Sequence, residues 1–248
     1  MREHQLPGGN ASGNVRRVKN TVRKPWTAAT PSVNAYVEAL RAAGIDAPEP
    51  LGLDEHGRSV QEFVHGTSAM TADPLLPSDL QRVGAIVRAI HDASAQFSPP
   101  ENAVWDTAIP APGDDLVCHN DLAPWNLIVG DRWVFVDWDA AAPSTRLWDL
   151  AYAAQAFTLN YPNQAPHAAA RSLAEFVGGY GADEAMRAAL PAEMARRTAA
   201  MRDLLSTSAS VGREPWASMH ANGHGAHWAA ATRYVETHQG VWRAALAN

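Results

Sequence analysis

This chain of 248 residues contains a single cysteine, and its 20 basic residues include just two lysines. One cysteine excludes a disulfide framework and a cysteine-rich zinc site. Because Lys19 and Lys24 are the two lysines of the chain, they are the candidates if a lysine takes part in the chemistry.

Long apolar segments are also missing. No stretch approaches the roughly 18 uninterrupted apolar residues of a membrane-spanning helix. The N-terminal sequence has no apolar run after its charges, so it does not read as a secretory signal. A net charge of −6 argues against non-specific binding to nucleic acid or to an anionic membrane. We therefore expect a cytoplasmic protein with neither nucleic acid nor membrane as partner.

The pattern of short β-prone runs and longer helical periods predicts two lobes. The expected strands cover residues 14–18, 21–25, 59–66, 116–121 and 126–139, and the expected helices cover 33–44, 78–94 and most of the chain from 147. The fold class is therefore α+β and bilobal. Residues 1–66 would form a small strand-rich lobe and residues 67–248 a larger, mainly helical lobe.

The segment 117–139 carries the most informative motif. It contains His119-Asn120-Asp121-Leu122-Ala123-Pro124-Trp125-Asn126, which fits the H-x-D-L-x-x-x-N catalytic loop of kinases. Asp137 follows at the end of an apolar strand. Phosphoryl transfer needs one carboxylate to orient the attacking hydroxyl, and an amide oxygen with a second carboxylate to hold Mg²⁺. The alternative is that these polar residues are turn formers.

This segment resembles the aminoglycoside phosphotransferase family, whose members are relatives of protein kinases that phosphorylate small molecules. The resemblance implies a protein-kinase-like fold, Asp121 as catalytic base, and Asn126 and Asp137 as the Mg²⁺ ligands. His119 would position the loop, and Asp149 would be a buried structural aspartate that braces it. Asp139 would either assist the metal or serve as an ordinary polar residue.

The resemblance extends less closely to the first lobe. Gly8, Gly9 and Gly13 lie in a run similar to a kinase glycine-rich loop, with an asparagine in place of the middle glycine. A flexible terminal turn is the alternative. The expected strands 14–18 and 21–25 form a hairpin with its turn at Lys19-Asn20, and similar proteins place a phosphate-binding cation on the second of them, where Arg23 and Lys24 are adjacent. Strand alternation lets one of them face the cleft, and we favour Arg23.

Two further features of this lobe concern the nucleotide. Residues 59–66 resemble the hinge between lobes, so that backbone groups of Gln61–Val64, those of Glu62 and Val64 included, would contact the adenine; a plain core strand is the alternative. The resemblance also implies a helix glutamate paired with the cation. Glu38 is the sole acidic residue of 33–43 and lies late in that helix, so the ion pair stays open.

A cluster of His220, His224 and His227 follows a spacing that could bring imidazoles together, although two glycines interrupt the helix there. No acidic partner is nearby in the sequence, so a metal site is the less favoured interpretation.

The sequence thus predicts a phosphotransferase that uses ATP or GTP with Mg²⁺ and acts on a hydroxyl of a small molecule, with antibiotics, amino alcohols and sugars as candidate acceptors. The excess of acidic residues after position 50 suggests an acidic acceptor-facing lobe. The alternative is a non-catalytic binding or immunity-type protein that keeps the fold.

Overall fold

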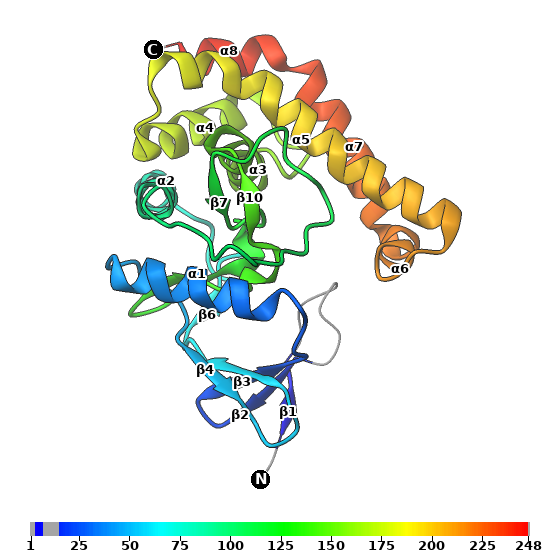
Figure 1. Ribbon diagram of the computed structural model, residues 1–248. Helices are drawn as coiled ribbons and strands as arrows, with labels where there is room; N and C mark the ends of the chain where they lie inside the picture. The colour runs from blue at the N-terminus through cyan, green and yellow to red at the C-terminus, as the bar shows by residue number, and fades with distance from the viewer. Residues whose placement is uncertain (1–2, 7–14, 248) are drawn as a thin grey trace.

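The computed structural model describes residues 3–6 and 15–247, and its N-terminal part is built on one antiparallel sheet (Figure 1). The strand order is β1-β2-β3-β5-β4, so β3 lies at the centre. The strands are β1 (His4–Gln5), β2 (Arg16–Val18), β3 (Thr21–Lys24), β4 (Pro50–Leu53) and β5 (Ser59–Glu62). The predicted hairpin turn joins β2 to β3, and Lys19 takes a left-handed φ of 56° there.

Helix α1 (Thr30–Ala42) lies between this sheet and the rest of the molecule (Figure 1). Pro31 stands in its first turn, where a missing N–H costs nothing. Val33, Tyr36 and Leu40 are buried and share the face that their helical spacing predicts. The Tyr36 hydroxyl donates to the Val117 carbonyl at 3.0 Å, which ties α1 to the strand that precedes the predicted catalytic loop.

Two small sheets carry the segment with the kinase-type motif. One pairs β7 (Leu116–Cys118) with β10 (Ala142–Ser144), and the other has the order β6 (Thr67–Ser68), β8 (Leu127–Val129), β9 (Trp133–Phe135). The short helix η1 (Pro124–Asn126) precedes β8, and η2 (Trp138–Ala140) follows β9. Both short helices therefore lie at the open end of the β8–β9 hairpin.

The larger lobe is helical. Its helices are α2 (Pro77–Ser94), α3 (Arg146–Thr158), α4 (Pro166–Tyr180), α5 (Glu184–Val211), α6 (Trp216–Met219), η3 (His220–His224), α7 (Gly225–Thr237) and α8 (Gln239–Leu246). Helices α2 and α4 approach closely because both carry glycine at the contact. A Cβ on Gly84 would overlap the Phe176 carbonyl, and one on Gly179 would overlap the Gln81 backbone.

Two groups of buried side chains form the interior. The larger group joins α1, α2, α3, α4, β8 and β9, and includes the fully buried Tyr36, Phe135, Phe176 and Trp242. The smaller group surrounds Tyr152 and Trp228, and packs α3 against α5 and α7. No helix in the described part of the chain is long and apolar enough to cross a membrane.

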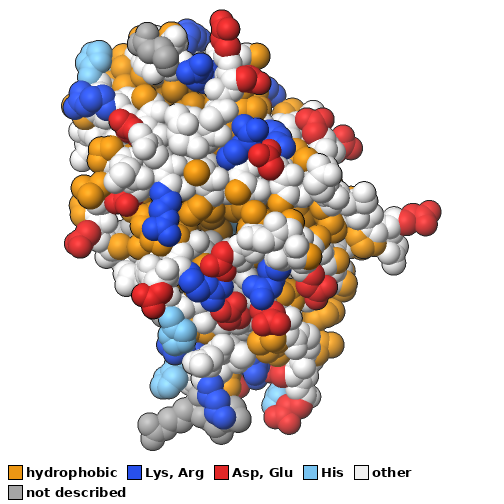
Figure 2. All heavy atoms as spheres, turned by 90° about the vertical axis from the view of Figure 1, so that its left-hand side faces the viewer, with side chains coloured by type: hydrophobic (Ala, Val, Ile, Leu, Met, Phe, Trp, Pro, Cys, Tyr) orange, Lys and Arg blue, Asp and Glu red, His pale blue; other side chains and the backbone are white. Residues whose placement is uncertain are grey.

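The exposed face in Figure 2 carries acidic and basic side chains side by side. A separate ion-pair group joins the lobes, in which Arg132 of the β8–β9 turn pairs with Asp46 and Glu62. The surface on this side therefore has no extended area of one sign.

The elements predicted from residue patterns are present with bounds shifted by a few residues. The strands that the patterns did not indicate are β1, β4, β6 and β10, each of two to four residues. Such strands are too short for a clear alternating pattern, and they form by pairing with the edge of a neighbouring strand.

Candidate active site

A cavity of about 1070 Å³ lies between the two lobes. Its lining comes from β3 and α1 on one side, from the loop at 120–126 and the turn at 137–140 on the second, and from α3, α5, α6 and α7 on the third. Segments far apart in the sequence therefore meet at one cleft, with Asp121 and Asp137 both on its surface.

The loop before Asp121 is held by Asn120. This residue has a left-handed φ of 62°, a conformation that asparagine tolerates better than most residues. Its side-chain amide donates to the carbonyls of Ala140 and Ala142, both at 3.2 Å. Its backbone N–H donates to Asp149 Oδ1 at 2.9 Å. The loop is thus fixed to η2, β10 and α3 at a single residue.

Both carboxylate oxygens of Asp121 accept a hydrogen bond. Oδ1 accepts from the Tyr152 hydroxyl and Oδ2 from Asn126 Nδ2, each at 2.8 Å. Burial raises the pKa of Asp121 to about 6, against the effect of the Tyr152 hydrogen bond. Asp121 is therefore a fixed carboxylate with a pKa close to neutrality, which suits a group that receives a proton.

Asn126 and Asp137 are brought together by the β8–β9 hairpin. The Val136 N–H donates to the Asn126 carbonyl at 2.8 Å, so the residues that flank this bond lie at one end of the hairpin. Asp137 has a left-handed φ of 64°. The Asn126 amide nitrogen is engaged by Asp121, which leaves its side-chain oxygen for a cation. An amide oxygen and a carboxylate are the hard ligands that Mg²⁺ prefers, so these residues fit that ion.

Of the adjacent Arg23 and Lys24, Lys24 is the one that faces the cleft. Its Nζ lies 3.1 Å from Asp137 Oδ1 and 2.7 Å from Asp139 Oδ1, and 6% of the residue is exposed. Burial alone would lower the pKa of Lys24, but the two carboxylates outweigh this effect and raise it. For Asp137 the two effects have the opposite signs. Burial tends to raise the pKa of Asp137, but Lys24 outweighs this effect and holds the pKa below its usual value.

The preference for Arg23 as the cleft-facing cation is wrong. Arg23 donates to Thr21 Oγ1 and forms an ion pair of 3.4 Å with Asp54, on the other face of β3. Alternation along the strand, together with the pairing of Lys24 opposite Ser59, directs Lys24 inward. Glu38 is exposed on α1. The carboxylates that pair with this lysine come instead from Asp137 and Asp139.

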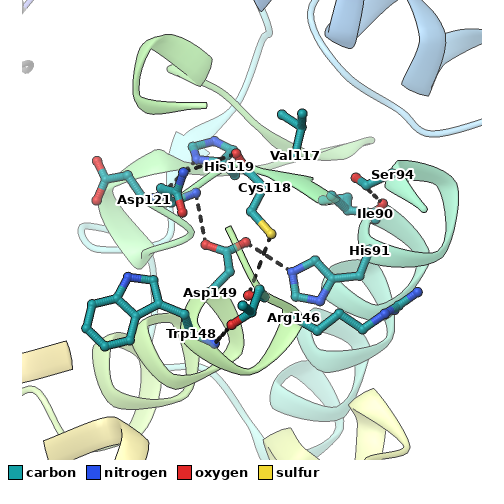
Figure 3. Close-up of polar contacts among 12 residues, drawn as sticks. Ile90, His91, Ser94, Val117, Cys118, His119, Asp121, Arg146, Trp148 and Asp149 are labelled. Atoms are coloured by element: carbon teal, nitrogen blue, oxygen red, sulfur yellow. Dashed lines mark hydrogen bonds and ion pairs between the residues drawn. The ribbon is translucent and has the colours of Figure 1, made fainter. Parts of the chain in front are cut away.

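His119 and Asp149 support the loop from behind (Figure 3). His119 Nε2 donates to the Val136 carbonyl at 3.2 Å, and its Nδ1 accepts from the Asp121 N–H at 3.2 Å. Burial lowers the pKa of His119, which keeps the ring neutral. Asp149 is completely buried and accepts from Asn120 N and from His91 Nε2, the latter at 3.0 Å.

A model of the phosphotransferase enzyme family matches residues 100–194, which include the loop, Asp137 and Asp149. The resemblance to the aminoglycoside phosphotransferase family is confirmed. A curated relative, the trifolitoxin immunity protein of Rhizobium leguminosarum bv. trifolii, is 30% identical over 155 residues. The match covers 60% of this chain and 59% of that protein, less than two thirds of its length.

Solved structures share the fold along nearly the whole chain. A choline/ethanolamine kinase family protein from Mesorhizobium loti has a TM-score of 0.62 at 17% identity and covers 100% of this chain and 92% of its own. A microcompartment-associated aminopropanol kinase has a TM-score of 0.65 at 15% identity, with coverage of 96% and 92%. An amicoumacin kinase in complex with AMP-PNP and Ca²⁺ has a TM-score of 0.66 at 13% identity, with coverage of 95% and 88%. The predicted two-lobed, protein-kinase-like α+β fold is confirmed.

The hinge prediction concerned backbone groups of residues 61–64, and their contact with a nucleotide stays a prediction. The Glu62 N–H is already engaged by the Glu49 carbonyl, and the Glu62 side chain points away from the cleft to pair with Arg132. Val64 is buried and is not part of the cavity lining, whereas Gln61 is. Because side chains alternate along β5, Gln61 rather than Glu62 is turned to the cavity. Gly8, Gly9 and Gly13 lie outside the described residues.

Several residues of the site were not found from the sequence. Tyr152 bonds to Asp121 from the same helix as the predicted Asp149, Arg197 bonds to the Asn120 carbonyl from α5, and His91 reaches Asp149 from α2. The signal for His91 was a polar residue on the buried face of a predicted helix.

Within the described residues, His91, Cys118 and Asp149 form the group whose ligand atoms lie close enough together for a metal ion. The cluster of His220, His224 and His227 does not form such a group. His227 instead bonds to Asn160 at 3.0 Å.

Proposed function

We propose that this protein transfers the γ-phosphoryl group of ATP or GTP to a hydroxyl group of a small molecule. The observation that carries the proposal is the position of Asp121, which is held by Tyr152 and Asn126 on the cavity that Asp137 and Lys24 also line. The family match and the small-molecule kinases among the structural relatives support the same reaction class. A cytoplasmic location is part of the proposal, because the nucleotide is available there.

In the reaction, the acceptor hydroxyl lies against Asp121, which takes its proton as the new oxygen–phosphorus bond forms. The bond between the γ-phosphorus and the oxygen that bridges it to the β-phosphate breaks, and this oxygen leaves with the nucleoside diphosphate. Asn126 and Asp137 would hold Mg²⁺, which would neutralise charge on the phosphates. Lys24 would contact the same phosphates. The rate enhancement comes mainly from positioning and charge neutralisation.

The test is Mg²⁺-dependent release of ADP or GDP with a panel of hydroxylated acceptors. Asp121→Ala should abolish turnover while ATP–Mg²⁺ still raises the melting temperature, because Asp121 acts on the acceptor and not on the nucleotide. Asp131→Asn is a matched control, since Asp131 is exposed in the β8–β9 turn and does not line the cavity. An unchanged kcat in the Asp121→Ala variant would show that Asp121 is not the catalytic base.

A second candidate is an immunity-type protein that binds a toxin without phosphorylating it. The relative named as a trifolitoxin immunity protein favours this candidate. The retained Asp121, Asn126 and Asp137 favour the enzyme. Absence of turnover with every acceptor, together with no thermal shift by ATP–Mg²⁺, would leave the binding protein as the better description.

A further inference from the structure

The peptide unit that joins Asn120 to Asp121 is held by hydrogen bonds at both of its polar atoms. The Asp121 N–H donates to His119 Nδ1 at 3.2 Å. The Asn120 carbonyl accepts from Nη2 of Arg197, a residue of α5, also at 3.2 Å. Asn120 itself has a left-handed φ of 62°, a conformation that costs energy in a residue with a side chain. Contacts that fix this peptide unit therefore also fix the direction in which the Asp121 side chain leaves the loop.

Arg197 occupies a costly position for a cation. The residue is 5% exposed, and its Nε and Nη1 are buried without a hydrogen-bond partner. Its guanidinium lies 4.2 Å from the ring centroid of Tyr152 and 5.5 Å from that of Trp148. These two aromatic faces offset part of the cost of taking the guanidinium out of water. A long apolar side chain would pack against the same rings without that cost, so packing alone does not account for an arginine here.

The feature that an apolar side chain would lack is the donor to the Asn120 carbonyl. In the described part of the chain, Arg197 is the residue that donates to this buried oxygen. The other anchors of Asn120 are its N–H, bonded to Asp149, and its side-chain amide, bonded to the Ala140 and Ala142 carbonyls. Those anchors precede the bond about which the next peptide unit turns. They leave its rotation to be limited by the bonds from Arg197 and to His119.

We propose that Arg197 is a positioning residue for phosphoryl transfer, which holds the Asn120–Asp121 peptide unit so that the Asp121 carboxylate faces the acceptor. Arg197 acts through the backbone of the loop and not on the substrate. The inference rests on the proposed function, because the effect on the rate requires Asp121 to be the base. The effect on the loop itself does not require turnover, so it can be measured separately.

Arg197→Met tests the inference, because methionine keeps a long apolar stem beside Tyr152 and removes the donor. Hydrogen exchange followed by NMR measures the protection of the Asp121 amide relative to amides in the middle of α4. We expect this relative protection to fall about ten-fold or more, because the peptide unit loses one of its two bonds. We also expect kcat to fall about ten-fold or more and the KM for ATP to change less than about three-fold. Arg202→Met is the control, since Arg202 lies on the same helix and pairs with Asp203.

The outcomes separate a positioning role from a packing role. Wild-type protection at Asp121, an equal loss of protection at Asp121 and in α4, or an unchanged kcat in an active enzyme would each overturn the inference and leave the phosphotransferase proposal intact. Lost protection at Asp121 in a protein that turns over no acceptor would support the hold of Arg197 on the loop and remove the proposed reaction. If Arg197→Met does not fold, Arg197→Lys decides by the same comparison, because lysine keeps the charge but lacks the planar group that carries Nη2.

Discussion

The two ends of the cavity differ in where their side chains come from. The transfer end, which comprises Lys24, Asp121, Asn126, Asp137 and Asp139, takes four of its five members from one stretch of 19 residues, 121–139. Its polar groups bond to one another over short distances. The apolar lining of the other end consists of Trp125, Tyr152, Met201, Trp216, Met219 and Trp228, which come from η1, α3, α5, α6 and α7. The polar groups of the transfer end are therefore encoded locally, whereas the apolar lining depends on how distant helices pack.

The comparison of Lys24 with Arg23 gives the largest expected effect. Lys24→Ala should lower kcat/KM by about 100-fold or more, because it removes the buried cation from the transfer end. Arg23→Ala should change kcat/KM less than about three-fold, since Arg23 pairs with Asp54 on the opposite face of β3. Steady-state kinetics with varied ATP measures both variants. Similar losses in the two would mean that the cleft-facing cation is not the functional one.

The part of the site that could be predicted from the sequence is the part whose residues lie close together along the chain. The spacing of His119, Asp121 and Asn126, with Asp137 at a strand end, was enough to predict the loop and its hairpin, because hairpin geometry fixes neighbours a few residues apart. The face of β3 was misjudged, since Arg23 and Lys24 are equally compatible with a strand until its pairing with β5 is known. Tyr152, Arg197 and His91 lie on helices well separated from the loop along the chain, and only tertiary packing brings them to Asp121, Asn120 and Asp149.

The pH profile tests whether Asp121 behaves as the burial at the transfer end requires. Burial raises the pKa of Asp121 to about 6, and the reaction needs the unprotonated carboxylate. Activity is therefore present above this pKa and falls as the pH drops through it, so that kcat/KM decreases roughly ten-fold between about pH 7 and about pH 5. A Tyr152→Phe variant should move the acidic limb upward, because one hydrogen bond to the charged form is lost. A flat profile over this range would exclude Asp121 as the titrating base.

The smallest expected effect concerns the support behind the loop, which neither end of the cavity contains. His91→Phe removes the donor to Asp149 Oδ2, and an unsatisfied buried carboxylate oxygen costs about 1–3 kcal/mol of unfolding free energy. Because Asp149 also accepts from Asn120 N, the loop should loosen, and kcat should fall several-fold while the KM for ATP stays unchanged.

Arg88→Ala is the control on the same helix, where an exposed ion pair with Asp92 contributes less than about 1 kcal/mol. Urea unfolding and steady-state kinetics measure the two quantities on the same samples. A variant that loses stability without losing kcat would show that Asp149 holds the fold together but does not position Asp121.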